Sequence, residues 1–209
     1  MSVALASLIV SMLAASAPTD MYSVIGDRPM AKALDIVERM CRCVITYEDP
    51  RYDEFAGDDR RSFTFSLVSR RDQRDLQPTL QALVDEFGHS GNPGRFRVYA
   101  AADGYRVVPR DAFGSLLETH VTAKAMRGTA LDALKAFTKS LAAAARTNVS
   151  LGALPEKLLT KSIVSVKPQT AEAEAILANI LHDSGHRLSW RLHYDRTSQQ
   201  YVLNLHSVD

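Results

Sequence analysis

The chain has 209 residues, of which 46% are hydrophobic and 23% charged, and its formal net charge is +1. This composition is that of a globular protein and excludes an intrinsically disordered chain, while the length suits one large domain or two small ones. A net charge so close to zero gives no basis for expecting a nucleic acid or an anionic membrane surface as the partner.

The N-terminus resembles an export signal. Residues 3–17 are uncharged and almost entirely apolar or small, a run shorter than the roughly 20 residues of a membrane-spanning helix. We expect residues 1–17 to be a signal peptide cleaved near Ser16 or Ala17, with Pro18 disfavouring the second site. The mature chain is then periplasmic or secreted and has no membrane span. Because no Lys or Arg precedes the run, the alternative is an uncleaved helix that is buried or serves as an anchor.

The first half of the chain shows alternating strand and helix periodicities. In chain order they predict a weak strand, a helix, two strands, a second helix and a hairpin, at 21–25, 29–41, 43–49, 62–69, 78–88 and 95–109. Asp103-Gly104 favours a two-residue hairpin loop, which pairs Val98 with Pro109 and Ala100 with Val107.

The second half repeats this order. The corresponding elements are predicted at 116–124, 129–141, 147–152, 162–167, 170–185 and 186–206. Thr129 is expected to cap the first of these helices and Thr170 the second. In the last hairpin, pairing Tyr194 with Tyr201 places the alternating apolar residues on one face, and we expect Trp190 to lie in the core.

These patterns predict an α+β fold with mainly antiparallel sheet, built of two related βαββαββ modules at residues 21–112 and 115–208. Such a module resembles a split-βαβ or ferredoxin-like sandwich with an added strand. "ALDIV" at 33–37 and "ALDAL" at 130–134 lie in corresponding helices, which supports a duplication. The alternative is that any α+β chain shows some echo of this kind.

Cys41 and Cys43 are the only cysteines. Because cysteines two residues apart close a strained ring, the sequence favours two buried thiols at a helix-to-strand junction. A Cys-x-Cys disulfide and an intermolecular bridge are the alternatives. Two ligands alone do not make a structural zinc site.

Glu48 and Asp49 are candidate acids at the end of a predicted strand that Pro50 terminates. Adjacent strand residues point to opposite faces, so the two carboxylates diverge, whereas a general acid and base must converge on one substrate. The pair is therefore a poor catalytic dyad, although either residue could act with a distant partner.

The histidines also give no convergent site. His182 and His186 have helical metal-ligand spacing, but Gly185 ends the helix between them. The predicted register separates His193 and His206 by about 13 Å, too far to share a metal ion. His89 lies in a glycine-rich loop beside Ser90, and His120 lies on a presumed strand. We assign no catalytic residue, no metal ligand and no cofactor-binding residue.

A helix followed by "ITYEDPRY", residues 45–52, resembles the N-terminal part of a group of uncharacterised exported bacterial proteins, which open with a signal sequence and a short αβ unit. More distantly, the helix–strand units resemble the short N-terminal modules of secretins and TonB-dependent receptors. In that family such modules bind and stack on other envelope proteins. The resemblance implies envelope binding or assembly and brings no catalytic residue or cofactor.

We therefore expect a non-catalytic binding or assembly protein whose partner is a protein of the bacterial envelope; the sequence does not give the oligomeric state. Two alternatives stay open. One is a hydrolase in which the fold brings together His89, His120 or Glu48. The other is a protein that binds a small molecule in the cleft between the two modules, because ligand sites favour such interfaces.

Overall fold

The computed structural model describes residues 19–51, 61–68, 75–110 and 114–208, so the expected signal peptide at 1–17 lies outside the described residues. Over these ranges the fold is mixed α/β, with five α-helices and twelve strands. None of the helices in the described ranges is long and apolar enough to cross a membrane.

The first half, residues 19–110, follows the predicted order closely. Its elements are β1 (Thr19–Gly26), α1 (Pro29–Cys41), β2 (Val44–Glu48), β3 (Arg61–Val68), α2 (Gln77–His89), β4 (Phe96–Ala101) and β5 (Gly104–Pro109). Pro29 stands in the first turn of α1, as expected, because its missing N–H has no intrahelical partner there. β1 and β3 form an antiparallel ribbon that packs on the helices.

The second half, residues 114–208, has more elements than predicted. They are a 3₁₀ helix η1 (Leu116–Glu118), β6 (His120–Ala123), β7 (Met126–Thr129), α3 (Ala130–Ala145), β8 (Asn148–Leu151), α4 (Glu156–Leu159), β9 (Ile163–Val166), β10 (Gln169–Glu172), α5 (Ala173–Asp183), β11 (Leu188–Asp195) and β12 (Gln200–Ser207). Thr129 caps α3 as predicted, since its hydroxyl accepts the Asp132 N–H at 3.1 Å. The predicted Thr170 cap is wrong, because Thr170 lies in β10 opposite Thr122.

One six-stranded sheet joins the two halves, in the order β4-β5-β2-β11-β12-β8. Each half supplies three strands. β4 and β5 are antiparallel, as are β11 and β12, whereas β5–β2, β2–β11 and β12–β8 are parallel pairs. Pairing among the described strands is mainly antiparallel, as predicted, since β1–β3, β6–β10 and β7–β9 are antiparallel as well; the parallel pairs all lie in this mixed sheet.

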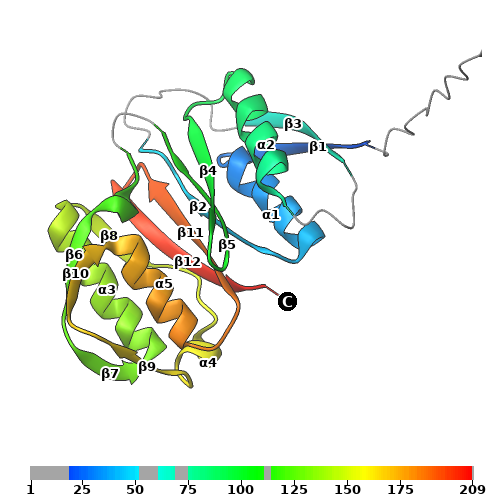
Figure 1. The fold of residues 1–209 in the computed structure, drawn as a ribbon. Coiled ribbons are helices and arrows are strands. Elements are labelled where there is room, and N and C mark those ends of the chain that lie inside the picture. Colours follow the sequence, from blue (N-terminus) through cyan, green and yellow to red (C-terminus); the bar gives the residue numbers. More distant parts are fainter. Residues whose placement is uncertain (1–18, 52–60, 69–74, 111–113, 209) are drawn as a thin grey trace, which may run out of the picture.

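The helices of the two halves cover opposite faces of this sheet (Figure 1). Tyr47 on β2 packs into the core formed with α1 and α2, and Arg191 on β11 is its neighbour in register. Because successive strand residues alternate between faces, Trp190 and Leu192 point the other way, into the core formed with α3 and α5. The strands of each half are therefore covered by their own helices on one face of the sheet. On the other face they lie next to the helices of the other half.

The two hairpins test the predicted registers. Tyr194 pairs with Tyr201, as predicted. In the first hairpin the prediction is wrong by two residues, because Val98 pairs with Val107 and Ala100 with Tyr105. Gly104 explains the shift. A Cβ at that position would lie 2.1 Å from the Val44 carbonyl oxygen, so Gly104 permits the close approach of β2 and starts β5 instead of forming the turn.

Cys41 and Cys43 form a disulfide, which corrects the expectation of two thiols. Arg42 between them ends α1 with a left-handed backbone, φ 50° and ψ 40°. This turn brings the two Cα atoms to 5.2 Å, within the range that a disulfide spans. Helical periodicity placed Cys41 on the apolar face of α1, but it could not show that the chain reverses at the next residue.

The disulfide leads to a thiol-count prediction. The unreduced protein, unfolded in guanidinium chloride, is expected to react with no Ellman's reagent, and the reduced protein with two equivalents, one for each cysteine of the chain. The Cys43→Ser variant is the control and should show one reactive thiol without reduction. Two reactive thiols in protein recovered from an oxidising compartment would contradict the bond.

Candidate functional site

The contact between β2 and β11, together with the charged side chains that flank it, forms the seam between the halves. Only two residue pairs align directly there, Tyr47 with Arg191 and Leu192 with Glu48. The Asp49 N–H extends this pairing by donating to the Leu192 carbonyl at 2.8 Å. Because backbone pairing across the seam is short, side chains contribute much of the contact.

Asp49 forms hydrogen bonds across one end of the seam. It is fully buried, and its Oδ2 accepts the Arg28 Nε–H at 2.8 Å and the Tyr194 N–H at 3.0 Å. A second guanidinium nitrogen of Arg28 donates to the Tyr194 carbonyl at 3.0 Å. Arg28 therefore binds both the carboxylate on the first half and the backbone of the second.

Glu48 binds a different element. Its two oxygens accept the Ser115 hydroxyl and the Leu116 N–H, each at 2.5 Å, at the start of η1. Neighbouring carboxylates thus contact separate parts of the fold, as expected for adjacent strand residues. Burial raises the pKa of Glu48 to about 7, and the hydrogen bonds from Ser115 and Leu116 offset only part of this effect.

The raised pKa predicts a pH-dependent stability. The folded protein keeps a proton on Glu48 that the unfolded chain releases between pH 4.5 and about 7, so the free energy of unfolding falls as pH rises through this window. The loss should amount to about 2–3 kcal/mol, from roughly 1.4 kcal/mol per pKa unit. Urea unfolding of Glu48→Gln at pH 5 and pH 8 should give similar midpoints, because the variant lacks the fall of unfolding free energy with rising pH. The exposed Glu156→Gln control should retain it.

A network of charges centred on the buried side chains of Arg191 and Glu38 lies on the α1 side of the seam. The guanidinium of Arg191, which is 4% exposed, donates to Asp35 at 2.8 Å and to Glu38 at 3.0 Å. It also donates to the Ile45 carbonyl. Glu38 in addition accepts the Ile45 N–H at 2.9 Å, so one carboxylate joins helix, strand and the opposite half.

His206 on β12 completes this network. Its Nε2 lies 2.6 Å from Glu38 Oε2 and donates to it. Burial by itself raises the pKa of Glu38, but the hydrogen bond from His206 and the charge of Arg191 outweigh burial and lower it overall. A cleft of about 500 Å³ opens here between α1 and the end of β12, lined by Asp35, Glu38, Arg39, Arg42, His206, Ser207 and Val208.

A second cleft, of about 720 Å³, lies between the β4–β5 hairpin and α5. Within it the Tyr99 hydroxyl donates to Glu174 at 2.5 Å, and Arg106 Nε donates to the same carboxylate at 2.9 Å. Arg106 is buried, binds Asp103 at 2.7 Å and places its guanidinium 5.9 Å from the centre of the Trp190 ring. Burial and the Glu174 carboxylate raise the pKa of Tyr99, so this phenol stays protonated.

The structure does not bring together the residues of the predicted hydrolase site. His89 contacts the Asp85 carbonyl of its own helix at 2.7 Å, and His120 begins β6, where it lies opposite Glu172 in the strand register. No hydrogen bond joins either histidine to Glu48 or to the other histidine within the described ranges. Both clefts described above have walls from both halves, but each is lined by charged side chains, and neither is formed by the two hairpins together.

The remaining histidines have separate roles. Gly185, with φ 74°, follows the end of α5 between His182 and His186, as predicted. His193 is half-buried and contacts the Asn204 amide at 3.3 Å, and burial lowers its pKa. His193 and His206 bind different partners, and no group of three potential metal ligands occurs in the described part of the chain.

Sequence reasoning missed the charged groups of the seam, above all Arg28, Glu38, Arg106 and Arg191. A signal for Glu38 did exist. It lies four residues after Leu34 and three before Cys41, on the apolar face of α1, where a carboxylate needs a buried partner. Nothing in the sequence indicated that this partner would be Arg191.

The chain matches no protein-family model, no curated protein and no solved structure. The resemblance to exported proteins and to the N-terminal modules of secretins therefore stays a prediction.

Proposed function

We propose that the protein is a non-catalytic binding or assembly protein of the bacterial envelope, whose partner protein adds an extended segment to β4. The observation that carries this proposal is the open edge of β4, which among the described residues pairs with β5 alone. The Arg110 N–H donates to the Arg95 carbonyl across the hairpin, so the alternate residues Phe96, Val98 and Ala100 direct their backbone groups away from β5. Such an edge can accept another strand.

The cleft beside β4 suggests the chemistry of the partner. Four carboxylates line it, those of Asp103, Glu118, Glu172 and Glu174, against two arginines, Arg97 and Arg106. Both arginines are already ion-paired within the chain, Arg97 to Glu118 and Arg106 to Asp103 and Glu174. The excess of carboxylates favours a partner segment that alternates apolar and basic side chains.

Two features support a pair of related modules. Both halves place three strands in the same sheet in the order β4-β5-β2 and β11-β12-β8, with an antiparallel hairpin and one parallel neighbour in each. Both α1 and α3 end at an arginine with a left-handed backbone, Arg42 at φ 50° and Arg146 at φ 52°. We infer from these shared features that one module was duplicated, and that the seam fixes the two copies as one rigid unit.

The test is photo-crosslinking in a Gram-negative host that exports the protein. A benzoylphenylalanine at Ala100, exposed on β4, should give a discrete adduct with an envelope protein. The same residue at Thr197, exposed in the β11–β12 turn, should give none. Intact mass should show the loss of 16 or 17 N-terminal residues. An unprocessed cytoplasmic chain would overturn the envelope assignment.

A matched pair of variants tests the strand-addition mode. Ala100→Pro removes the outward N–H, whereas Ala100→Ser retains it, and proline is tolerated at a strand edge. With a crosslinker placed at Arg97, Ala100→Pro should abolish the adduct and Ala100→Ser should preserve it. Equal adduct yields from the two variants would contradict binding along β4.

A further inference from the structure

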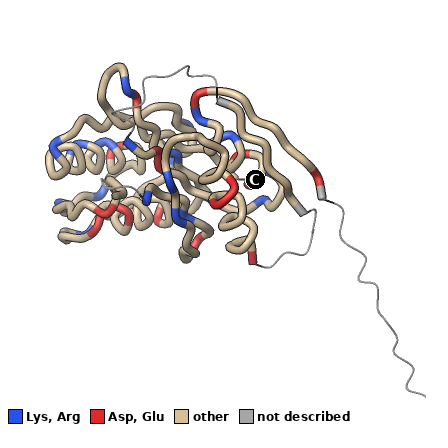
Figure 2. Tube along the Cα trace, turned by 90° about the horizontal axis from the view of Figure 1, so that it is seen from above, with Lys and Arg blue, Asp and Glu red and all other residues tan. Residues whose placement is uncertain are grey.

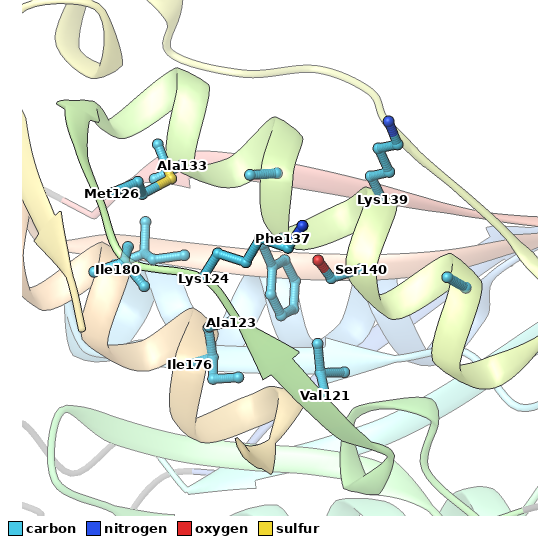
Figure 3. A pocket seen from close by; sticks show the side chains of 13 residues that line it. Val121, Ala123, Lys124, Met126, Ala133, Phe137, Lys139, Ser140, Ile176 and Ile180 are labelled. Carbon is cyan, nitrogen blue, oxygen red and sulfur yellow. The ribbon is translucent and has the colours of Figure 1, made fainter. Parts of the chain in front are cut away.

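A pocket of about 420 Å³ lies in the second half, between α3, α5 and the ribbon formed by β6, β7, β9 and β10 (Figure 3). Its walls are apolar over most of their area and include Val121, Met126, Phe137, Ile176 and Ile180. This volume lies within the roughly 300–1,000 Å³ of small-molecule sites. The pocket is separate from the seam and from both clefts between the halves.

The ribbon opens above this pocket because its pairing is interrupted. β7 with β9 and β6 with β10 keep one common register, from Thr129 opposite Ile163 to His120 opposite Glu172. The interruption falls at residues 124–125 and 167–168. Continuing the register would place Pro168 opposite Lys124, and Pro168 has no N–H to donate. Small side chains on α3, those of Ala133, Ala136, Ser140 and Ala143, leave the space beneath it unfilled.

The first half fills the corresponding layer. There the β1–β3 ribbon is paired without a break over eight residues, and its inward side chains include Phe63 and Phe65, which are 1% and 0% exposed. Tyr22 stacks on Phe65 with ring centroids 5.6 Å apart. In the second half the inward side chains are smaller, such as Val164, Val166 and Ala123. The pocket therefore comes from side-chain size and from a broken strand pair.

Two lysines flank the pocket. Lys124 and Lys139 line it and are exposed, and no described residue forms a hydrogen bond or ion pair with either ammonium group. Figure 3 shows the Lys124 side chain running across the pocket in the direction of Phe137, with the Ser140 hydroxyl nearby. None of the described residues that line the pocket carries a carboxylate. Its mouth is therefore positively charged and its interior apolar.

We propose that this pocket binds a single-chain amphiphile with an anionic head group, such as a fatty acid. The hydrocarbon chain lies between α3 and the ribbon against Phe137 and Ile176, where burial of apolar surface stabilises it. The anionic head group lies at the mouth beside the Lys124 ammonium and accepts a charge-assisted hydrogen bond from it. Lys139, whose side chain extends away from the pocket in Figure 3, adds positive charge at the rim. The free acid and the acyl chain of an anionic lipid share this chemistry.

Calorimetric titration of the full-length protein with sodium laurate tests the proposal, and saturable binding to one site is expected. Ala136→Trp, at an exposed α3 position that lines the pocket, should weaken binding at least about tenfold by filling it. Lys124→Glu combined with Lys139→Glu should weaken laurate binding by a similar factor and leave 1-dodecanol binding unchanged. Lys135→Glu, on α3 but outside the pocket lining, is the matched control and should bind laurate normally.

Vesicles of dilauroyl phosphatidylglycerol distinguish the two sources of the ligand. Co-sedimentation lost in Ala136→Trp assigns the site to membrane-held acyl chains, and laurate binding without co-sedimentation assigns it to the free acid. Absence of both overturns the proposal. So does laurate binding that survives Ala136→Trp, or equal loss of laurate and dodecanol binding in the double lysine variant.

Discussion

Replacing Arg191 with methionine is expected to lower the free energy of unfolding by about 3–5 kcal/mol. The guanidinium is 4% exposed and binds Asp35, Glu38 and the Ile45 carbonyl. Its removal takes away the cation that neutralises the buried Glu38 carboxylate and leaves it the hydrogen bonds from the His206 and Ser189 side chains. The cost arises mainly from this uncompensated buried charge. Urea unfolding followed by the fluorescence of Trp190, the single tryptophan, measures it.

Two controls separate the buried charge from a general effect of losing an arginine. Arg187→Met removes an exposed arginine near the same hairpin and should cost less than about 1 kcal/mol. Among the described residues its guanidinium donates a hydrogen bond to the Arg42 carbonyl alone. Adding Glu38→Met to Arg191→Met should recover a large part of the loss, because apolar replacement of a complete buried pair is close to neutral. A double variant less stable than Arg191→Met would contradict this account.

The seam also bears on the proposed role. Arg28, Arg106 and Arg191 each connect one half to the other, through Tyr194, Glu174 and Glu38. Figure 2 shows acidic and basic residues interspersed along the described chain, in keeping with pairing of opposite charges rather than a face of one sign. These contacts place the β4–β5 hairpin against α5, so a partner segment added to β4 would also meet α5.

Local patterns predicted the elements well, because each depends on neighbours in the sequence. The Thr129 cap, the Pro29 start and the Tyr194–Tyr201 register all follow from residues within a few positions of one another. The predicted register of the first hairpin was wrong because Gly104 packs closely against the backbone of Val44, a residue of another strand. Turn chemistry alone could not include that contact.

The candidate site was harder to predict than the elements. Glu48 and Asp49 drew attention as a pair, yet each binds residues of the other half or of the connecting segment, more than 65 and 140 positions away respectively. The pocket beneath the second ribbon depends on the interruption between the β6–β10 and β7–β9 pairs, and no local pattern reveals which strands pair there. The two helix pairs, α1 with α2 and α3 with α5, cover opposite faces of the sheet. This arrangement likewise follows only from the parallel contact of β2 with β11.

Replacing Trp190 with alanine is the second change expected to have a large effect, about 3–5 kcal/mol of unfolding free energy. The indole is 1% exposed within the core of the second half and also lies beside the Arg106 guanidinium. Loss of the indole leaves a cavity and removes a contact of the buried Arg106 guanidinium, which binds Glu174 of the other half. Circular dichroism must follow unfolding, because this variant has no tryptophan.

The Trp190 variants also test whether the two halves unfold together. Trp190→Phe preserves an aromatic ring beside Arg106 and should cost less than the alanine variant. If the seam couples the halves, Trp190→Ala in the second half should lower the midpoint of one cooperative transition of the whole protein. The first half, which contains the Cys41–Cys43 disulfide, should then unfold in that same transition. Two separated transitions, one at the wild-type midpoint, would show that the charged groups of the seam do not make one rigid unit. The strand-addition surface would then rest on the first half alone.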